Sequence, residues 1–154
     1  MVSRIDKSQV DKIGSVLYWS SVVLAALAAL DALYLLIFKL TGNSQMCLGN
    51  GGCHDVNFSP YSEIYGIPVS IFGLLAYLAI LGILFLEARV KIIKENGPLV
   101  NFGIGLVGVA FSIYLTYLEI YVIHAICPFS VASAILITLI FILAIIRLVK
   151  QFSN

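Results

Sequence analysis

Four long apolar blocks, separated by short polar stretches, dominate the pattern of residues along this chain. They run from Ile13 to Leu40, Ile67 to Leu86, Leu99 to Ile123, and about Cys127 to Leu148, each with 20 or more residues. A helix that rises about 1.5 Å per residue needs about 20 residues to cross a bilayer core. Strands are disfavoured because the alternation of a lipid-facing barrel strand is missing. The pattern predicts an all-α, single four-helix transmembrane domain over residues 1–154.

Composition agrees with this pattern and narrows the class of protein. The chain is 61% hydrophobic and 11% charged, with a net charge of +1, whereas soluble domains carry roughly 25% charged residues. These values exclude a disordered chain, a nucleic-acid binder and a water-soluble enzyme. We therefore expect a small multi-pass protein of the cell membrane, in contact with membrane lipid.

Basic residues predict the orientation of the four helices. With a cytoplasmic N-terminus, eight of the nine Lys and Arg residues lie inside and only Lys39 lies outside, as the positive-inside rule requires. Both termini are then cytoplasmic. Residues 41–66 and 124–126 face outward, and so do Cys47, Cys53 and Cys127, on the side where disulfides persist.

Two acids interrupt the apolar blocks. Asp31 lies 18 residues beyond Ile13, and Glu119 lies 20 beyond Leu99, so both are expected near the outer interface. The simpler interpretation is that both reach water, and the alternative is a charge beside an outer-facing site. Small residues at Gly108, Ser112 and Thr116 predict a ridge for close helix packing.

The outer loop carries a closely spaced pair of cysteines. Cys47 and Cys53 flank five residues, three of them Gly and one Asn, which make a short loop easy to close. The pair can serve as a structural disulfide or as a redox pair. Metal binding is not predicted, since His54 and His124 lack the spacing of zinc ligands relative to the cysteines.

The third cysteine opens the fourth apolar block. Pro128 suits the first turn of a helix, and a thiolate at a helix N-terminus is stabilised by the helix dipole. Cys127 and Ser130 are one turn apart, as in Cys-x-x-Cys redox pairs, but Ser130 cannot form a disulfide. Upstream, Ser59 to Gly66 predicts a short capped helix, either a lid over the outer mouth or a connector.

Taken in order, these features resemble the vitamin K epoxide reductase family over residues 13–150. The matching segments are Cys47 and Cys53, Ser59, the Pro-Val-Ser-Ile-Phe-Gly run at 68–73, Ser-Ile-Tyr-Leu at 112–115, and Cys-Pro-Phe-Ser at 127–130. The short loop between the first two cysteines is more similar to microbial homologues than to vertebrate members.

The resemblance implies a four-helix bundle that holds a quinone, of the ubiquinone or menaquinone type, near the outer surface. Cys47 would exchange with a separate thioredoxin-like partner, and Cys53 would relay electrons to Cys127. Position 130 would face the quinone and Ser59 would hydrogen-bond it. The expected pocket residues are Phe72, Leu115 and Phe129.

Two departures from the family pattern shape the expected function. Val69 stands where vertebrate members carry Asn, and Ser130 stands where the family has its quinone-proximal cysteine. Without a thiol at 130, a mixed Cys53–Cys127 disulfide would persist. We therefore expect a quinone-linked membrane thiol oxidoreductase, trapped or impaired in this chain. The alternative is a non-catalytic four-helix membrane protein whose loop is stapled by Cys47–Cys53.

Overall fold

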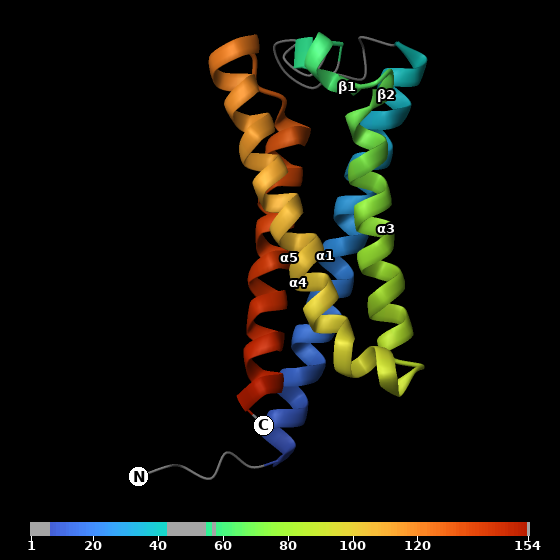
Figure 1. Cartoon of the computed structure of the whole chain (residues 1–154), viewed down its shortest axis with the longest axis vertical. Coiled ribbons are helices and arrows are strands. Elements are labelled where there is room, and N and C mark those ends of the chain that lie inside the picture. The colour runs from blue at the N-terminus through green and yellow to red at the C-terminus, as the bar shows by residue number, and fades with distance from the viewer. Residues whose placement is uncertain (1–6, 43–54, 57, 154) are drawn as a thin grey trace.

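The computed structural model describes residues 7–42, 55–56 and 58–153, and four long helices dominate it (Figure 1). They are α1 (Lys7–Thr41), α3 (Val69–Glu87), α4 (Lys91–Tyr117) and α5 (Pro128–Ser153). The short elements are η2 (Pro60–Ser62), β1 (Glu63–Ile64), β2 (Ile67–Pro68) and η3 (Leu118–Ile123). Four helices of the described chain are long and apolar enough to cross a membrane. The predicted all-α four-helix fold is confirmed.

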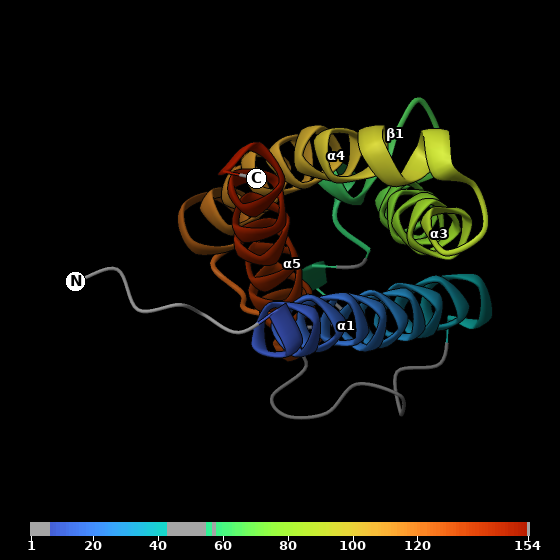
Figure 2. The ribbon, with the colours of Figure 1, turned by 90° about the horizontal axis from the view of Figure 1, so that it is seen from below.

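The helices form a ring in which each packs against two neighbours. Helix α1 contacts α3 and α5, and α4 contacts the same two helices from the opposite side (Figure 2). The small hairpin of β1 and β2 lies at one end of the bundle, and both termini lie at the other (Figure 1). This arrangement leaves space inside the ring toward the hairpin end.

Small side chains bring the helices together. The core of the ring contains four buried alanines of α1 together with Tyr77, Ile80 and Leu84 of α3 and Ile137 and Ile140 of α5; the alanines are Ala25, Ala28, Ala29 and Ala32. On α4, a Cβ at Gly108 would lie 2.8 Å from Ile137 Cγ1, so only glycine permits this approach to α5. The predicted small-residue ridge is thus correct at Gly108, whereas Ser112 and Thr116 line a cavity.

The third span differs from its predicted boundaries. Helix α4 begins at Lys91, eight residues before the predicted start at Leu99, and Pro98 lies inside it. Proline removes one backbone donor but leaves the helix continuous here. At its far end α4 passes into η3, a π-helix that ends at Ile123 and is followed by His124, whose φ is 57°. Apolar pattern alone misses the start because residues 91–97 are mostly polar.

The segment after the outer loop is not the short helix that was predicted for Ser59 to Gly66. Only Pro60–Ser62 form a helical turn, and the chain then makes the β1–β2 hairpin. Tyr65 and Gly66, between the strands, both have positive φ, at 53° and 81°, as a two-residue type I′ turn requires. Gly66 therefore reverses a hairpin, and the second helix starts at Val69 instead of Ile67.

Lys39 is the one basic residue that the charge pattern predicts on the outer side. It connects this hairpin to α1. Its Nζ lies 3.1 Å from Glu63 Oε1 and donates a hydrogen bond to the Ser62 hydroxyl. The side chain is almost fully buried. Segment 58–68 is thereby fastened over the end of the bundle, and we call it the lid.

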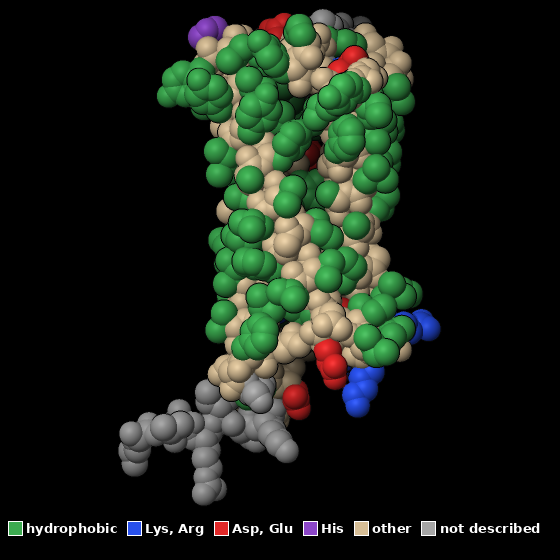
Figure 3. All heavy atoms as spheres, in the orientation of Figure 1, with side chains coloured by type: hydrophobic (Ala, Val, Ile, Leu, Met, Phe, Trp, Pro, Cys, Tyr) green, Lys and Arg blue, Asp and Glu red, His purple; other side chains and the backbone are tan. Residues whose placement is uncertain are grey.

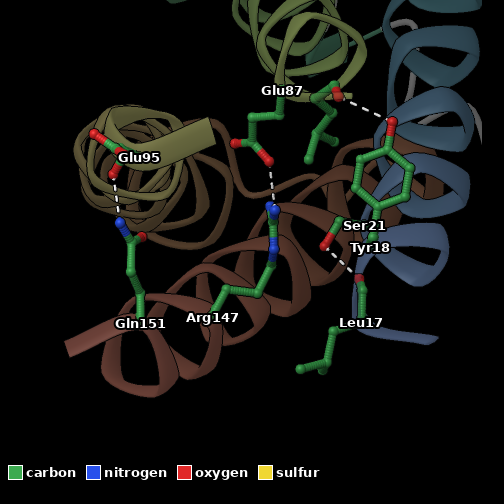
Figure 4. Close-up of polar contacts among 8 residues, drawn as sticks. Leu17, Tyr18, Ser21, Glu87, Glu95, Arg147 and Gln151 are labelled. Carbon is green, nitrogen blue, oxygen red and sulfur yellow. Dashed lines mark hydrogen bonds and ion pairs between the residues drawn. The ribbon is translucent and has the colours of Figure 1, made fainter. Parts of the chain in front are cut away.

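At the opposite end, one ion pair joins three helices (Figure 4). Arg147 of α5 donates to Glu87 of α3, and its guanidinium lies 5.9 Å from the centre of the Tyr18 ring of α1. The Tyr18 hydroxyl donates to the Leu84 carbonyl at 2.9 Å. Lys and Arg side chains gather at this end of the surface (Figure 3).

Candidate functional site

A mostly apolar cavity of about 740 Å³ lies inside the upper half of the bundle. Helices α3 and α4 supply most of its wall, and α1 and α5 close the back. Figure 3 shows the surface hollowed between the α3 and α4 sides in this half. A smaller space of about 80 Å³ continues it beneath the lid. The two spaces share five lining residues, Leu35, Val69, Ser70, Leu115 and Ser130.

Few polar groups face this cavity, and their hydrogen bonds differ. Tyr77 and Ser133 bond to each other, with their hydroxyl oxygens 2.7 Å apart. Ser70, at the second position of α3, has a buried hydroxyl with no hydrogen-bond partner among the residues described. A buried hydroxyl that stays unpaired costs free energy. Ser70 is therefore placed to bind a polar atom of a ligand.

Glu119 lies at the outer end of the cavity and is 3% exposed. Its carboxylate accepts hydrogen bonds from the Ser130 hydroxyl and from the backbone N–H of Cys127. The interpretation of Glu119 as an interfacial acid that reaches water is wrong, because the start of α5 covers it. The sequence did show a carboxylate eight residues before the cysteine that precedes the fourth helix, and this could have marked Glu119 as a site residue. The hydrogen-bond partner of Glu119, Ser130, could not be predicted from the pattern.

Asp31 lies ten residues before the end of α1, which is about 15 Å along a helix axis. It is partly buried, and its Oδ2 atom is buried with no hydrogen-bond partner among the residues described. Asp31 therefore lies about three turns from the end of α1 that faces the hairpin, deeper than the interface expected from the sequence.

Cys127 is 1% exposed and lies directly before α5. It packs in a small cluster with Phe38, Leu35, Val56 and Phe129. Leu35 also lines the cavity, so this cluster and the cavity share a wall. Cys127 thus immediately precedes α5 and Ser130 lies in its first turn, with Cys127 in the cluster and residue 130 at the cavity.

The predicted pocket residues are placed as follows. Phe72 and Leu115 line the cavity as expected. Phe129 does not, because one residue step turns a helix by about 100° and carries its ring away from the Ser130 direction. That ring packs on Tyr34 instead, with centroids 4.6 Å apart.

Ser59 belongs to the lid and lines the smaller space beneath it. Its hydroxyl donates to the Val56 carbonyl at 2.9 Å and makes no capping bond to η2. The hydrogen that was predicted to bind a ligand oxygen is therefore used within the chain. Cys47 and Cys53 lie outside the described residues, so their predicted pairing stays a prediction.

A second cavity, of about 980 Å³, lies at the end of the bundle that carries the termini. Charged side chains make up much of its wall, including Arg89, Lys94, Glu87 and Asp11. It is remote from Cys127 and from the lid, and such walls do not suit an apolar ligand.

Four helices that can each cross a membrane, arranged around a mostly apolar cavity, define a multi-pass membrane protein. The chain belongs to the vitamin K epoxide reductase family, whose family model matches residues 19–145. This confirms the resemblance seen in the motifs. The chain is also 31% identical over 122 residues to thiol-disulfide oxidoreductase LTO1 of Arabidopsis thaliana. That match covers 75% of this chain and 32% of the relative, so the chain spans about a third of its length.

Proposed function

We propose that this protein is a membrane thiol oxidoreductase that passes electrons from outer-loop cysteines, through Cys127, to a quinone in the apolar cavity. The observation that carries the proposal is the position of the cavity's outer end against the first turn of α5, where Ser130 lines it and Cys127 precedes it. A relative named as a thiol-disulfide oxidoreductase supports the same chemistry.

The cavity residues fit a quinone. The volume of the cavity, about 740 Å³, falls in the range of roughly 300–1,000 Å³ that is typical of small-molecule sites. Such sites are mostly apolar and contain a few well-placed polar groups. Apolar side chains such as Phe72, Val107 and Leu115 suit a ring and an isoprenoid tail, and the unpaired Ser70 hydroxyl suits a carbonyl oxygen. A bound quinone would supply the two-electron acceptor.

Val56 supports a route from the outer loop to Cys127. It packs in the Cys127 cluster, and Cys53 precedes it by three residues. Covalent geometry keeps the two Cα atoms within about 11 Å. Exchange would proceed by attack of a thiolate on a disulfide sulfur, and Cys47 would then be the cysteine that meets a thioredoxin-like partner.

Ser130 limits what this chain can do in the proposed relay. Its hydroxyl cannot take part in disulfide exchange, so Cys127 has no neighbour within its own turn to complete the transfer. We propose that the chain rests with a Cys53–Cys127 disulfide and turns over slowly.

The test is the variant Ser130→Cys, assayed with a dithiol and a soluble short-chain quinone by following quinone absorbance. We expect the variant to consume quinone faster than the parent chain, and Cys127→Ser to abolish the gain. Ser133→Cys is a matched control one turn further along α5, and should show no gain. Quinone consumption that is equal in parent and Ser130→Cys, at saturating dithiol, would contradict the proposal.

Alkylation of the unreduced parent followed by mass spectrometry separates the relay from the structural alternative. The relay leaves Cys47 alkylated in the unreduced parent. Alkylation of Cys127 alone, after opening of the fold, would instead favour a Cys47–Cys53 staple.

A further inference from the structure

Glu119 is a buried acid that the proposed relay does not use. It is 3% exposed and lines the smaller space under the lid, and its carboxylate contacts both ends of the Cys127–Ser130 turn. Burying a carboxylate costs free energy unless it is hydrogen-bonded. The two hydrogen bonds of the Glu119 carboxylate therefore indicate what the acid does.

The backbone around Glu119 holds the side chain at this position. Glu119 lies in the π-helix η3, a geometry that often marks functional sites. Its carbonyl accepts the N–H groups of His124 and Ala125, the latter at 3.0 Å. Main chain and side chain of one residue therefore both fasten the connection between η3 and α5.

The hydrogen bond between Glu119 and Ser130 has a direction that matters to a ligand. A hydroxyl has one hydrogen and two lone pairs. In the structure the Ser130 hydroxyl donates to Glu119, so Ser130 can only accept a hydrogen bond from the cavity. If Glu119 were protonated, its own O–H would donate to Ser130 Oγ, and the Ser130 hydrogen would become available to the cavity.

We propose that Glu119 is a positioning residue that sets, through its proton, whether Ser130 accepts from or donates to the ligand. The inference rests on the proposed function and deepens it. Ionised Glu119 favours a quinol, which offers a hydroxyl hydrogen to Ser130. Protonated Glu119 favours a quinone, which offers only carbonyl lone pairs.

The same pair accounts for a proton in the overall reaction, in which two thiols and a quinone give a disulfide and a quinol. Two electrons leave sulfur, and two protons must reach the ligand oxygens. One passes through the Glu119–Ser130 pair, and the other reaches the second oxygen from water, into which the second thiol releases its own proton. A thiol that reacts as thiolate has already lost its proton. Glu119 holds that proton, and returns it by donating to Ser130 Oγ while Ser130 passes its hydroxyl hydrogen to the ligand oxygen. The carboxylate that remains is protonated again by the next thiol to ionise.

Glu119→Gln tests the proposal by ligand binding, without turnover. The glutamine carbonyl can keep the Cys127 N–H bond, while its amide NH₂ donates to Ser130 and turns the Ser130 hydrogen toward the cavity. We expect the ratio of quinone to quinol affinity, measured by anaerobic calorimetry with a short-chain ubiquinone analogue and its quinol, to rise by roughly 2- to 12-fold, the effect of one neutral hydrogen bond.

Two controls show whether the effect runs through Ser130. In a Ser130→Ala chain, Glu119→Gln should leave the affinity ratio unchanged, because the bridge is missing. Glu87→Gln makes the same change at a buried acid at the other end of the bundle, and should also leave it unchanged. An unchanged ratio in Glu119→Gln, or a change that persists without Ser130, would overturn the proposal.

Infrared difference spectroscopy of the parent keeps the inference testable if Glu119→Gln fails to fold. We expect a carboxyl band that differs between the quinone-loaded and quinol-loaded parent and is also present in Glu87→Gln. No such band would overturn the proton role. If the parent binds neither ligand, the proposed function itself is wrong, which is a different outcome from binding without a change in ratio.

Discussion

Two serines near the cavity differ in one hydrogen bond, and that difference predicts different roles for them. The Ser59 hydroxyl donates its hydrogen to the Val56 carbonyl. Ser70 has a buried oxygen that finds no partner in the part of the chain described, and it lines both the cavity and its extension. At the scale of single residues, Ser70 is therefore the better donor to a ligand oxygen.

Ser70→Ala should weaken binding of a short-chain quinone by roughly 2- to 12-fold, because one neutral hydrogen bond is lost. The same change should leave the ligand-free thermal midpoint equal or higher, since it removes an unsatisfied buried hydroxyl. Calorimetry and thermal unfolding in detergent measure the two effects. Ser59→Ala is the matched control and should lower the midpoint while changing affinity less. A larger affinity loss in Ser59→Ala would restore the role predicted from the motif.

The four helices converge at the end that carries the termini. Glu87 of α3 is 6% exposed and pairs with Arg147 of α5. Its Oε1 lies against α4 at Gly97, where a Cβ would be only 2.1 Å away. Tyr18 of α1 lies beside the guanidinium. One ion pair therefore sets the spacing of elements that are far apart along the chain.

Arg147→Met should destabilise the bundle by about 3–5 kcal/mol, because it leaves the buried Glu87 charge without its partner. Denaturant unfolding in micelles measures the loss. Adding Glu87→Gln should recover part of it by removing that charge. Arg89→Met is the control, since the exposed Arg89 guanidinium only lies over Phe85, at 5.3 Å from the ring centre, a contact of roughly 0.5–1 kcal/mol. Equal losses in the two Arg variants would contradict this account.

The whole molecule is strongly polarised between its two ends. Both termini and the α3–α4 connection lie at one end, and the lid and the start of α5 lie at the other (Figure 1). Seven Lys and Arg residues belong to the terminal end in the described segments, namely Lys7, Lys12, Arg89, Lys91, Lys94, Arg147 and Lys150. From the positive-inside rule we predict that this end lies in the cytoplasm and the lid outside.

Thiol labelling of spheroplasts with an impermeant reagent, after reduction, should therefore modify Cys47 from the outside. Cys127→Ser removes the one cysteine that is not part of the outer loop. In that background, Ala88→Cys places a reporter beside Arg89 at the other end, and it should react only after the membrane is permeabilised. Labelling with the opposite pattern would reverse the orientation and, with it, the proposed redox compartment.

The predictions of secondary structure were correct where the local sequence alone determines the structure. Apolar runs of 20 or more residues became helices because a bilayer leaves backbone groups no other partners. The prediction failed where polar residues extend a helix, as before Leu99, and where two positive-φ residues, Tyr65 and Gly66, replace a helix by a hairpin. The positive φ of Tyr65 could not be predicted from its residue type, because the left-handed region is uncommon for an aromatic residue.

The four helices, the separation of basic residues to one end and the family membership could be predicted from the chain alone, because they depend on composition and on the order of motifs. The pairing of polar groups could not be predicted in this way and is seen only in the folded structure. Glu119 and Ser130 are 11 residues apart, and Glu87 and Arg147 are 60 apart. The partner of Glu119, the unpaired hydroxyl of Ser70 and the turn of Phe129 toward Tyr34 all depend on how separate helices face one another. The periodicity of apolar residues in a sequence does not show which face of one helix meets which face of another.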